Sequence, residues 1–320
     1  MEKPGLSPLV AARADALAYY SPYYFLRQFA AERQQALFGT GAADRWEQGV
    51  GAKIFHSRAS PTAAEVCWLL QELAWDSDYF GTPMYRLFTG LFPAQATAEE
   101  LVQAARGLRQ QLVTRHGAFY AFSVVPAEDI RLLQALTGAG WRLVETRLTY
   151  YHDQLSAFDY PRHPVRAAEV EEAAHIGRVA AAARNAYDRF HADAWFGEVR
   201  ADAYLARYAE NTVAAGLAAV VLLPDSSGLP VDSFLAISDL NDDAAALGSR
   251  LSRVLLTAVG PANRGWHVKL MAETLHRAKA LGHEAVLMTT QSTNHAVFRT
   301  CEKLGFRLGA TSHVLACHSH

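Results

Sequence analysis

The sequence has few cysteines, no excess of basic residues and no long hydrophobic run. Three cysteines among 320 residues, Cys67, Cys301 and Cys317, are spaced too widely for a disulfide framework or a metal motif, which is typical of a reducing compartment. A formal net charge of −2 provides no basic field to attract nucleic acid or acidic membrane. No apolar run approaches the ~20 residues of a membrane helix, and the N-terminal residues lack a hydrophobic core of the signal type. We therefore expect a cytoplasmic protein that binds neither nucleic acid nor membrane, and the histidine spacing predicts no metal.

What the chain does contain is enough apolar sequence for a large core. Apolar residues make up 51% and charged residues 19% of the chain, and its length favours two domains over one. Helical and strand patterns alternate, which indicates an α/β class. We expect an aromatic-rich N-terminal extension (residues 1–58), an α/β domain (59–152), a proline-containing linker (153–164) and a second domain (165–320).

The first half shows a clear order from residue 62 onward. Two capping boxes, Thr62 to Glu65 and Thr97 to Glu100, predict helices that run to about Leu73 and to Gly117. Strands are predicted at residues 85–92, 119–125 and 141–151, with a helix at 126–139. The aromatic run at residues 19–25 favours core or interdomain packing, with a binding surface as the alternative.

The second half predicts a longer series of elements. Helices are expected at residues 167–183 and 200–213, and the strands 217–223 and 231–240 flank a turn-rich segment, which indicates a β-hairpin. A strand (251–259), a turn (260–265), an amphipathic helix (266–281), a strand (284–290), a short helix and a final strand (306–317) follow. Strand, turn and helix in this order can present backbone N–H groups to an anionic ligand.

A short internal sequence similarity suggests that both halves share one arrangement of helices and strands. Gly140-Trp141-Arg142-Leu143 and Gly305-Phe306-Arg307-Leu308 each follow a predicted helix. The corresponding turn of the first half, residues 92–96, has neither glycine nor a basic residue. Only the second half is therefore expected to hold a phosphate-bearing cofactor.

Residues of the second half resemble the acetyl-CoA core of the GNAT (GCN5-related) N-acetyltransferase family. The resemblance lies in Val259, Pro261, Arg264-Gly265, Gln291, Asn294 and the segment 302–306, and Gly305 follows Asn294 by eleven positions as in the family pattern. It implies an α/β (α+β) fold with two GNAT-like mixed-sheet halves, the C-terminal half being the acyl-CoA domain. It also implies an acyl-CoA-dependent N-acetyltransferase that uses acetyl-CoA as co-substrate.

The same resemblance implies which residues hold the cofactor. A splayed strand would supply backbone N–H groups to the thioester and pantetheine, and the following turn would supply N–H groups and the helix dipole to the pyrophosphate. Asn294 would hydrogen-bond near pantetheine. The implied strand and turn residues are Thr257, Ala258, Val259, Arg264, Gly265, Trp266, His267, Val268 and Lys269.

Three positions depart from the family pattern. His267 and Lys269 replace two glycines of the turn, so a Cβ at each could block the phosphate, or their side chains could add positive charge. Lys269 also lies one helical turn from Glu273, which is a sufficient reason for a surface lysine. Cys301 replaces the family tyrosine that protonates the thiolate; it is either that acid or an inert core residue.

For the acceptor, the resemblance extends to a two-domain branch of the family. Residues 75–81, 143–149 and 189–193 are similar to enzymes that acetylate the 4-amino group of dTDP-4-amino-4,6-dideoxygalactose (dTDP-fucosamine). This implies substrate contacts from Arg189, His191 and Asp193, with a solvated loop of local ion pairs as the alternative. Asp239, at a strand end, is a competing candidate for the base.

The expected function is N-acyl transfer from acetyl-CoA to the amine of a small polar acceptor such as a nucleotide-linked amino sugar. Two alternatives stay open: a GNAT-like binding or scaffold protein without catalysis, and an acetyltransferase for a peptide or antibiotic amine. A second copy of the chain, forming a homodimer, is left open as a partner.

Overall fold

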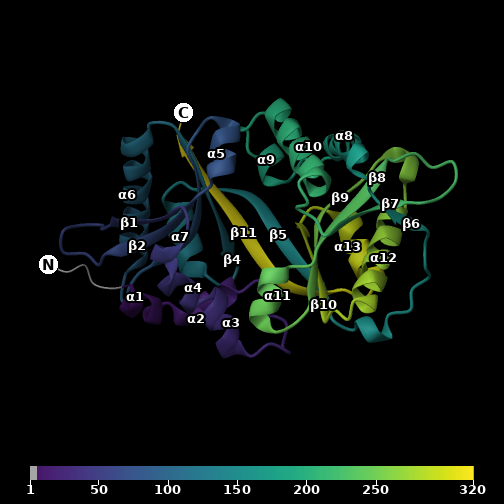
Figure 1. Cartoon of the computed structure of the whole chain (residues 1–320). Coiled ribbons are helices and arrows are strands. Elements are labelled where there is room, and N and C mark those ends of the chain that lie inside the picture. The colour runs from purple at the N-terminus through teal and green to yellow at the C-terminus, as the bar shows by residue number, and fades with distance from the viewer. Residues whose placement is uncertain (1–5, 320) are drawn as a thin grey trace. The chain divides into compact units, whose positions relative to one another are not determined.

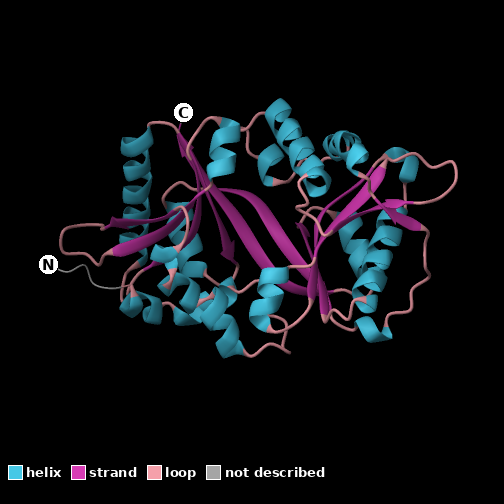
Figure 2. Cartoon of the chain, in the orientation of Figure 1, coloured by secondary structure: helices cyan, strands magenta, loops and turns pink. Residues whose placement is uncertain are grey.

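The computed structural model describes residues 6–319 of the chain, and its contacts divide the chain into two compact units (Figure 1). Unit 1 consists of Met1–Thr146 with Thr311–His320, and unit 2 consists of Arg147–Ala310. Each unit is a mixed sheet flanked by helices (Figure 2).

The sheet of unit 1 has the strand order β1-β2-β3-β4-β11. Strands β3 and β4 are parallel, and the other neighbours in this sheet are antiparallel. The strands are β1 (Ala52–Ser57), β2 (Val66–Glu72), β3 (Met84–Leu91), β4 (Phe119–Pro126) and β11 (Arg307–Ser319). The helices are α1 (Ser7–Ala12), α2 (Ala14–Leu17), α3 (Ala31–Phe38), α4 (Thr40–Asp44), α5 (Ala74–Phe80), α6 (Ala98–His116) and α7 (Ile130–Gly138).

Strand β2 shows how unit 1 buries both faces of its sheet. Trp68 and Leu70 belong to the core formed with α6 and α7, while Cys67 and Leu69 belong to a second core formed with α1, α2 and α4. Side chains alternate between the faces of a strand, so a strand buried on both faces reads as a continuous apolar run. The N-terminal residues are therefore part of unit 1 and not an extension to it.

A buried polar cluster ties the N-terminal segment to α7. The Arg13 guanidinium pairs with the Asp129 carboxylate, and the Tyr20 hydroxyl donates to Asp129 Oδ2 at 2.8 Å. Asp129 also accepts from the backbone N–H of Leu132 and so caps α7. Tyr23 is fully buried. Core packing, the favoured interpretation of the aromatic run, is confirmed for Tyr20 and Tyr23.

The sheet of unit 2 has the strand order β5-β10-β9-β8-β7-β6; among its described strands β9 and β10 are parallel and the other neighbours are antiparallel. The strands are β5 (Arg142–His152), β6 (Val165–Ala167), β7 (Val220–Pro224), β8 (Ser233–Ser238), β9 (Leu251–Val259) and β10 (Ala285–Gln291). The helices are α8 (Ala173–Ala182), α9 (Arg189–Ala192), α10 (Glu198–Ala214), α11 (Asn241–Leu247), α12 (Trp266–Ala280) and α13 (His295–Lys303).

Alternation along β8 again separates two cores. Leu235 and Ile237 pack in the core that includes α12 and α13, whereas Phe234 and Ala236 pack in the core that includes α8 and α10. The predicted hairpin is confirmed, because β7 and β8 pair in antiparallel fashion. The predicted helix near residue 167 begins later, at Ala173, because β6 uses residues 165–167.

Each unit completes its sheet with a strand from the other half of the sequence. Residues 147–152 of β5 pair with β10 in unit 2, and Ser312–Ser319 of β11 pair with β4 in unit 1. The two segments of the internal sequence similarity lie at the starts of these two strands. Gly140 and Gly305 precede them with φ of 89° and 79°, a conformation that favours glycine.

Two expectations about the first half need correction. The helix predicted from Thr62 to Leu73 is wrong, because residues 66–72 form β2; Glu65 pairs with His56 and Arg58 instead of capping a helix. The division between the units also differs from the expected boundary. The segment predicted as a linker, 153–164, lies in unit 2, where Phe158 is in the core and Arg162 pairs with Glu273.

The capping box at the start of α6 is confirmed and gives a stability prediction. Thr97 Oγ1 accepts from the Glu100 backbone N–H, and the Glu100 carboxylate accepts from the Thr97 N–H at 2.8 Å. Replacing Thr97 with alanine should lower the free energy of unfolding by about 1 kcal/mol, as measured by urea unfolding followed by circular dichroism. Thr114→Ala, on the exposed side of the same helix, should change it by less than ~0.5 kcal/mol. Equal effects would contradict the cap.

Candidate functional site

Strands β9 and β10 separate part of the way along their length. They pair from Leu251 with Ala285 to Val254 with Met288, and among the described residues no pairing continues beyond. A cavity of about 180 Å³ lies where they diverge. Its lining comes from both strands, from the α8–α9 loop and from the start of α13, and includes residues 254–258, 288–291, Asn185, Asp188 and Asn294.

On its other side β9 stays paired to β8. The register runs to Val259, opposite Ser233, and shifts near Leu255, which has no counterpart between Ala236 and Ile237. Successive backbone groups of a strand point to opposite edges, so this part of β9 turns half of its hydrogen-bonding groups toward the divergence. Thr257, Ala258 and Val259 lie in this part of the strand, as the family resemblance implies.

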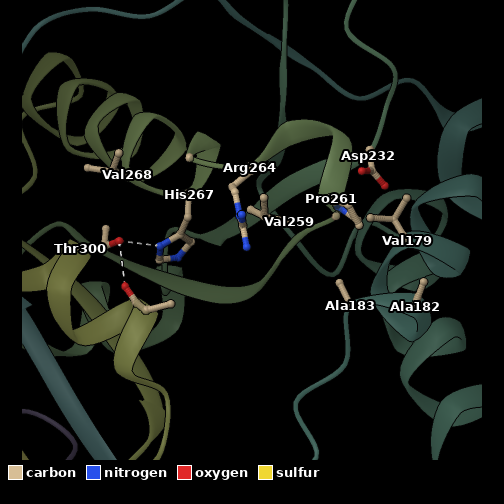
Figure 3. A pocket seen from close by; sticks show the side chains of 13 residues that line it. Val179, Ala182, Ala183, Asp232, Val259, Pro261, Arg264, His267, Val268 and Thr300 are labelled. Atoms are coloured by element: carbon tan, nitrogen blue, oxygen red, sulfur yellow. Dashed lines mark hydrogen bonds between the residues drawn. The ribbon is translucent and has the colours of Figure 1, made fainter.

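A larger cavity of about 790 Å³ lies at the N-terminus of α12 (Figure 3). Gly265 is the N-cap with φ of 89°, and among the described residues no side chain caps this end of the helix. The first backbone N–H groups of a helix have no intrahelical partner and carry its positive dipole end. The cavity is lined by Val179, Ala182, Ala183, Asp232, Val259, Gly260, Pro261, Arg264, Gly265, His267, Val268, Ala296 and Thr300.

Two charged residues of opposite sign line this cavity. Figure 3 shows the Arg264 side chain directed into the open space, and Arg264 is exposed. Asp232 instead stabilises the turn, because its carboxylate accepts from the Ala262 N–H at 2.8 Å. A Cβ at Gly260 would lie 2.1 Å from Asp232 Oδ1, so this contact requires glycine. Arg264 is left as the cation directed at a ligand.

His267 is neutral in this environment. The Thr300 hydroxyl donates to the Ala296 carbonyl at 3.1 Å, so at 2.9 Å from Thr300 Oγ1 the His267 Nδ1 must carry the hydrogen and donate. Nε2 is then a buried acceptor, and no described group bonds to it. Burial lowers the pKa of His267 to about 4. The positive charge considered for His267 is therefore absent from the unliganded site at neutral pH.

Lys269 does not pair with Glu273. Its Nζ lies over the Trp266 ring at 4.5 Å from the centroid. Glu273 is buried, and accepts instead from Arg162 at 2.9 Å and from the backbone N–H of His163 at 2.5 Å. Lys269 is not one of the described residues that line the cavity at the α12 N-terminus. The turn thus reaches the ligand space through the backbone and Arg264 more than through Lys269.

Cys301 and Asn294 lie on α13 in different settings. Cys301 has no exposed surface, lies in the core with Val297 and Leu304, and burial raises the pKa of its thiol to about 12. This environment fits the inert core residue better than the acid. Asn294 caps the helix by accepting from the Val297 N–H at 3.3 Å and lines the cavity between the strands. Its amide N–H groups are the part suited to a ligand.

The expected acceptor residues gather around α9. His191 Nδ1 bonds to Asp188 at 2.7 Å, and His191 Nε2 bonds to Asp202 at 3.1 Å. Arg189 and Asp193 are buried, and the Arg189 guanidinium stacks on Phe190 at 4.1 Å from the ring centroid. These contacts agree with the local network that was the alternative to substrate binding. His191 and Asp193 nevertheless line a cavity of about 190 Å³ beside α9.

Asp239 is committed to a structural pair. Arg277 binds both of its carboxylate oxygens, at 2.7 and 2.8 Å, and Ser252 donates to it at 3.2 Å. Although burial opposes the shift, these partners lower the pKa of Asp239. Arg277 lies about three helical turns, or roughly 16 Å, along α12 from the helix N-terminus. Asp239 lines neither cavity, so it is badly placed to act as a base there.

Three residues at these cavities were not expected from the sequence. Asp188 is the N-cap of α9 and reaches the divergence of the strands, while Asp232 and Thr300 hold the turn and His267. Asp188 has a recognisable signal, because aspartate before a short polar-aromatic segment is typical of an N-cap. Thr300 and Asp232 have none, since their roles depend on tertiary contacts.

Comparisons with known proteins support a fold and nothing finer. No protein-family model and no curated protein matches the sequence. Among solved structures, a GCN5-related N-acetyltransferase from Sphaerobacter thermophilus is 12% identical with a TM-score of 0.53, over 99% of this chain and 93% of that one. A tandem GNAT protein from the clavulanic acid biosynthesis pathway is 13% identical with a TM-score of 0.50, over 98% and 95%.

A third similar structure is a glucosamine N-acetyltransferase region of a fungal multi-domain GH3 β-N-acetylglucosaminidase. It is 12% identical with a TM-score of 0.58, over 98% of this chain and 37% of that one. The expected fold class is confirmed: the chain has two GNAT-like mixed-sheet halves, and solved structures described as GNAT proteins share its fold over nearly the whole chain. Within residues 6–319, no helix has both the length and the apolar character needed to cross a membrane.

The depressed pKa of His267 predicts how acid affects the protein. The unfolded chain takes up a proton at this residue below about pH 6.5, whereas the folded chain resists it until about pH 4. His267 therefore costs no stability above pH 7 and on the order of 3 kcal/mol once the pH falls below 4. His267→Gln, which does not titrate, should lose less stability between pH 7 and pH 4 in urea unfolding.

The same prediction can be checked directly by nuclear magnetic resonance. A pH titration of the histidine ring signals should show one ring with a pKa about two units below that of free histidine, assigned by its loss in His267→Gln. A His267 pKa near 6.5 would contradict the buried neutral ring.

Proposed function

We propose that the chain is an acyl-CoA-dependent N-acetyltransferase. The observation that carries this proposal is the continuity of the site along one stretch of chain. The open end of the β9–β10 pairing leads through Val259 and Pro261 to the uncapped N-terminus of α12, with Arg264 beside it. An elongated ligand with a polar amide chain at one end and phosphates at the other matches this order of groups.

The residues present fit acetyl-CoA. The β9 backbone at Thr257–Val259 and the Asn294 amide would bond the pantetheine amides, because these groups line the divergence and can donate or accept. The N–H groups of Gly265–Val268 and the Arg264 guanidinium would hold the pyrophosphate. When bound, acetyl-CoA supplies the activated acyl group. No glycine is needed at His267 for this, because the residue has ordinary helical geometry in α12.

His267 gives this site an electrostatic property of its own. A neutral imidazole with an unprotonated Nε2 offers an acceptor where an anion needs a donor. A phosphate beside it favours the protonated ring, since an opposite charge within ~4–6 Å raises a histidine pKa. Cofactor binding would therefore be accompanied by proton uptake at His267 and would strengthen as the pH falls.

The acyl transfer itself requires a neutral amine and a proton for the leaving thiolate. Cys301 is unsuited to supply that proton, because a fully buried thiol with a pKa near 12 reaches neither cavity. Asp188 reaches the divergence, but it already accepts bonds from two backbone N–H groups and from His191. It is thus suited to orient the amine, while water takes up the role of proton donor.

The acceptor we propose is the amine of a nucleotide-linked amino sugar. The similarity of residues 75–81, 143–149 and 189–193 to the dTDP-fucosamine acetylating branch supports it, and a neighbour that acts on glucosamine is compatible with an amino-sugar acceptor. The test is a thiol-release assay with acetyl-CoA and a panel of nucleotide-linked amino sugars, free amino sugars, peptides and antibiotic amines. Turnover of peptides alone would replace the sugar nucleotide with a peptide amine as acceptor.

Arg264 provides the sharpest test of cofactor binding. Because a hydrogen bond to a charged group contributes about 1.5–3 kcal/mol, Arg264→Met should weaken acetyl-CoA binding by roughly ten- to a hundredfold in isothermal titration calorimetry. Arg207→Met, on the exposed surface of α10, is the matched control and should leave the affinity unchanged. Wild-type protein that gives no heat and no thermal stabilisation with millimolar acetyl-CoA would refute the proposal.

The environment of Cys301 favours one second candidate, a GNAT-like protein that binds its ligand without catalysis. In that case acetyl-CoA binds, but no amine of the panel releases thiol. Turnover of any single amine excludes this candidate.

Cys301→Ala separates a catalytic role from a packing role. We expect the variant to keep most of the wild-type rate of thiol release and to lose roughly 1 kcal/mol of stability, because the thiol is a core group. A rate loss of more than ~100-fold in a variant that is still folded would show that the thiol acts as a general acid.

A further inference from the structure

Three side chains of unit 1 with different donor atoms converge on the β1–β2 hairpin, and none of them lines a cavity described above. His56 lies opposite Cys67 in the antiparallel register, and Glu65 comes two residues before Cys67. All three lie on the sheet face that carries Ile54 and Leu69, because side chains two apart on a strand share a face. One imidazole, one thiol and one carboxylate thus meet at the end of the hairpin that adjoins the 58–65 connection.

The separations of these donor atoms suit one small cation. His56 Nδ1 lies 3.3 Å from Glu65 Oε2 and 3.4 Å from Cys67 Sγ, and the three atoms all lie within 4.8 Å of one another. Tetrahedral zinc with bonds of ~2.0–2.3 Å places its ligand atoms roughly 3.3–3.6 Å apart. Two of the three edges already have this length, so an ion needs only a small movement of Glu65 or Cys67.

Neighbouring side chains hydrogen-bond to two of the three residues. The other carboxylate oxygen of Glu65, Oε1, accepts from Arg58 at 3.1 and 3.3 Å, which leaves Oε2 directed at His56. Gln111 on α6 donates to the His56 carbonyl at 2.7 Å and holds the end of β1. Such outer hydrogen bonds orient metal ligands in proteins. Cys67 is buried, whereas His56 and Glu65 are part-exposed, so an ion has a route in from solvent.

The donor set also selects the kind of ion. Thiolate and imidazole favour zinc and the later transition metals over magnesium and calcium, which prefer oxygen ligands. On binding, the Cys67 thiol loses its proton to solvent and a sulfur–metal bond forms. The hydrogen that His56 Nδ1 directs at Glu65 is exchanged through solvent for one on Nε2, so that Nδ1 presents a lone pair to the ion, and Glu65 binds through a carboxylate oxygen. Water completes the fourth position.

We propose that His56, Glu65 and Cys67 form a zinc-class metal site that clasps the β1–β2 hairpin. The metal site holds together the ends of β1 and β2 that flank the 58–65 connection. Strand β1 is the edge strand of the unit 1 sheet. This site is independent of the proposed acetyl-CoA binding, since unit 2 supplies all of the residues assigned to the cofactor. Its role is to stabilise unit 1. The spacing of these ligands along the chain does not predict the site, because the register of two strands brings them together.

Cobalt is the probe, because Co²⁺ bound to a thiolate has a sulfur-to-metal charge-transfer absorption. The full-length, untagged protein is stripped with a chelator, freed of it and titrated with Co²⁺. We expect this absorption to saturate near one equivalent and to disappear when Zn²⁺ is added. Cys67→Ser should abolish it. His56→Gln and Glu65→Gln should weaken Co²⁺ binding by at least tenfold.

Matched variants guard against binding elsewhere and against misfolding. Cys317→Ser and Cys301→Ser remove the other two thiols and should keep the absorption, and Lys53→Met changes the same strand without touching a ligand. Zn²⁺ should also raise the thermal midpoint of the wild type but not of Glu65→Gln, which preserves the shape of the side chain. The proposal is overturned if folded wild type gives no charge-transfer absorption with excess Co²⁺, or if folded Cys67→Ser retains it.

Discussion

The point at which β9 and β10 stop pairing is the constraint on which the proposed site depends. A parallel pair that continued past Val254 would satisfy its backbone groups internally and leave no room between the strands. Because β8 stays paired with β9 as far as Val259 while β10 leads into α13, the unpaired backbone must find other partners. Asn294 and Asp188 border on that gap, and β9 continues from it through Val259 to the turn before α12, so the rest of the site follows from it.

Much of the fold could be predicted from local pattern. The capping box at Thr97, the hairpin around residues 224–228 and the strand–turn–helix order from Leu251 each depend on neighbours in the chain, and the structure confirms them. The helix predicted over the residues of β2 was wrong for a physical reason. A strand buried on both faces is a continuous apolar run, and a run of that kind after a threonine and a glutamate cannot be told from a helix by periodicity.

The site was less predictable, because its chemistry depends on burial and tertiary partners. Arg264 and Gly265 could be found from a motif, and their placement at the cavity agrees with it. The neutral state of His267 could not, since it requires Thr300 from another helix and the exclusion of water. Asp239 lies at a strand end, as expected of a base, but its pairing with Arg277 across the sheet was invisible in the sequence.

The exchange of strands between the two halves has a consequence for synthesis and for truncation. Ser312–Ser319, which are synthesised after unit 2, complete the sheet of unit 1, whose other strands are made first. The edge of β4 in unit 1 therefore stays uncovered until all of unit 2 has been translated. A chain cut at the sequence midpoint would leave each half without one of its strands, so neither half is a natural unit of expression.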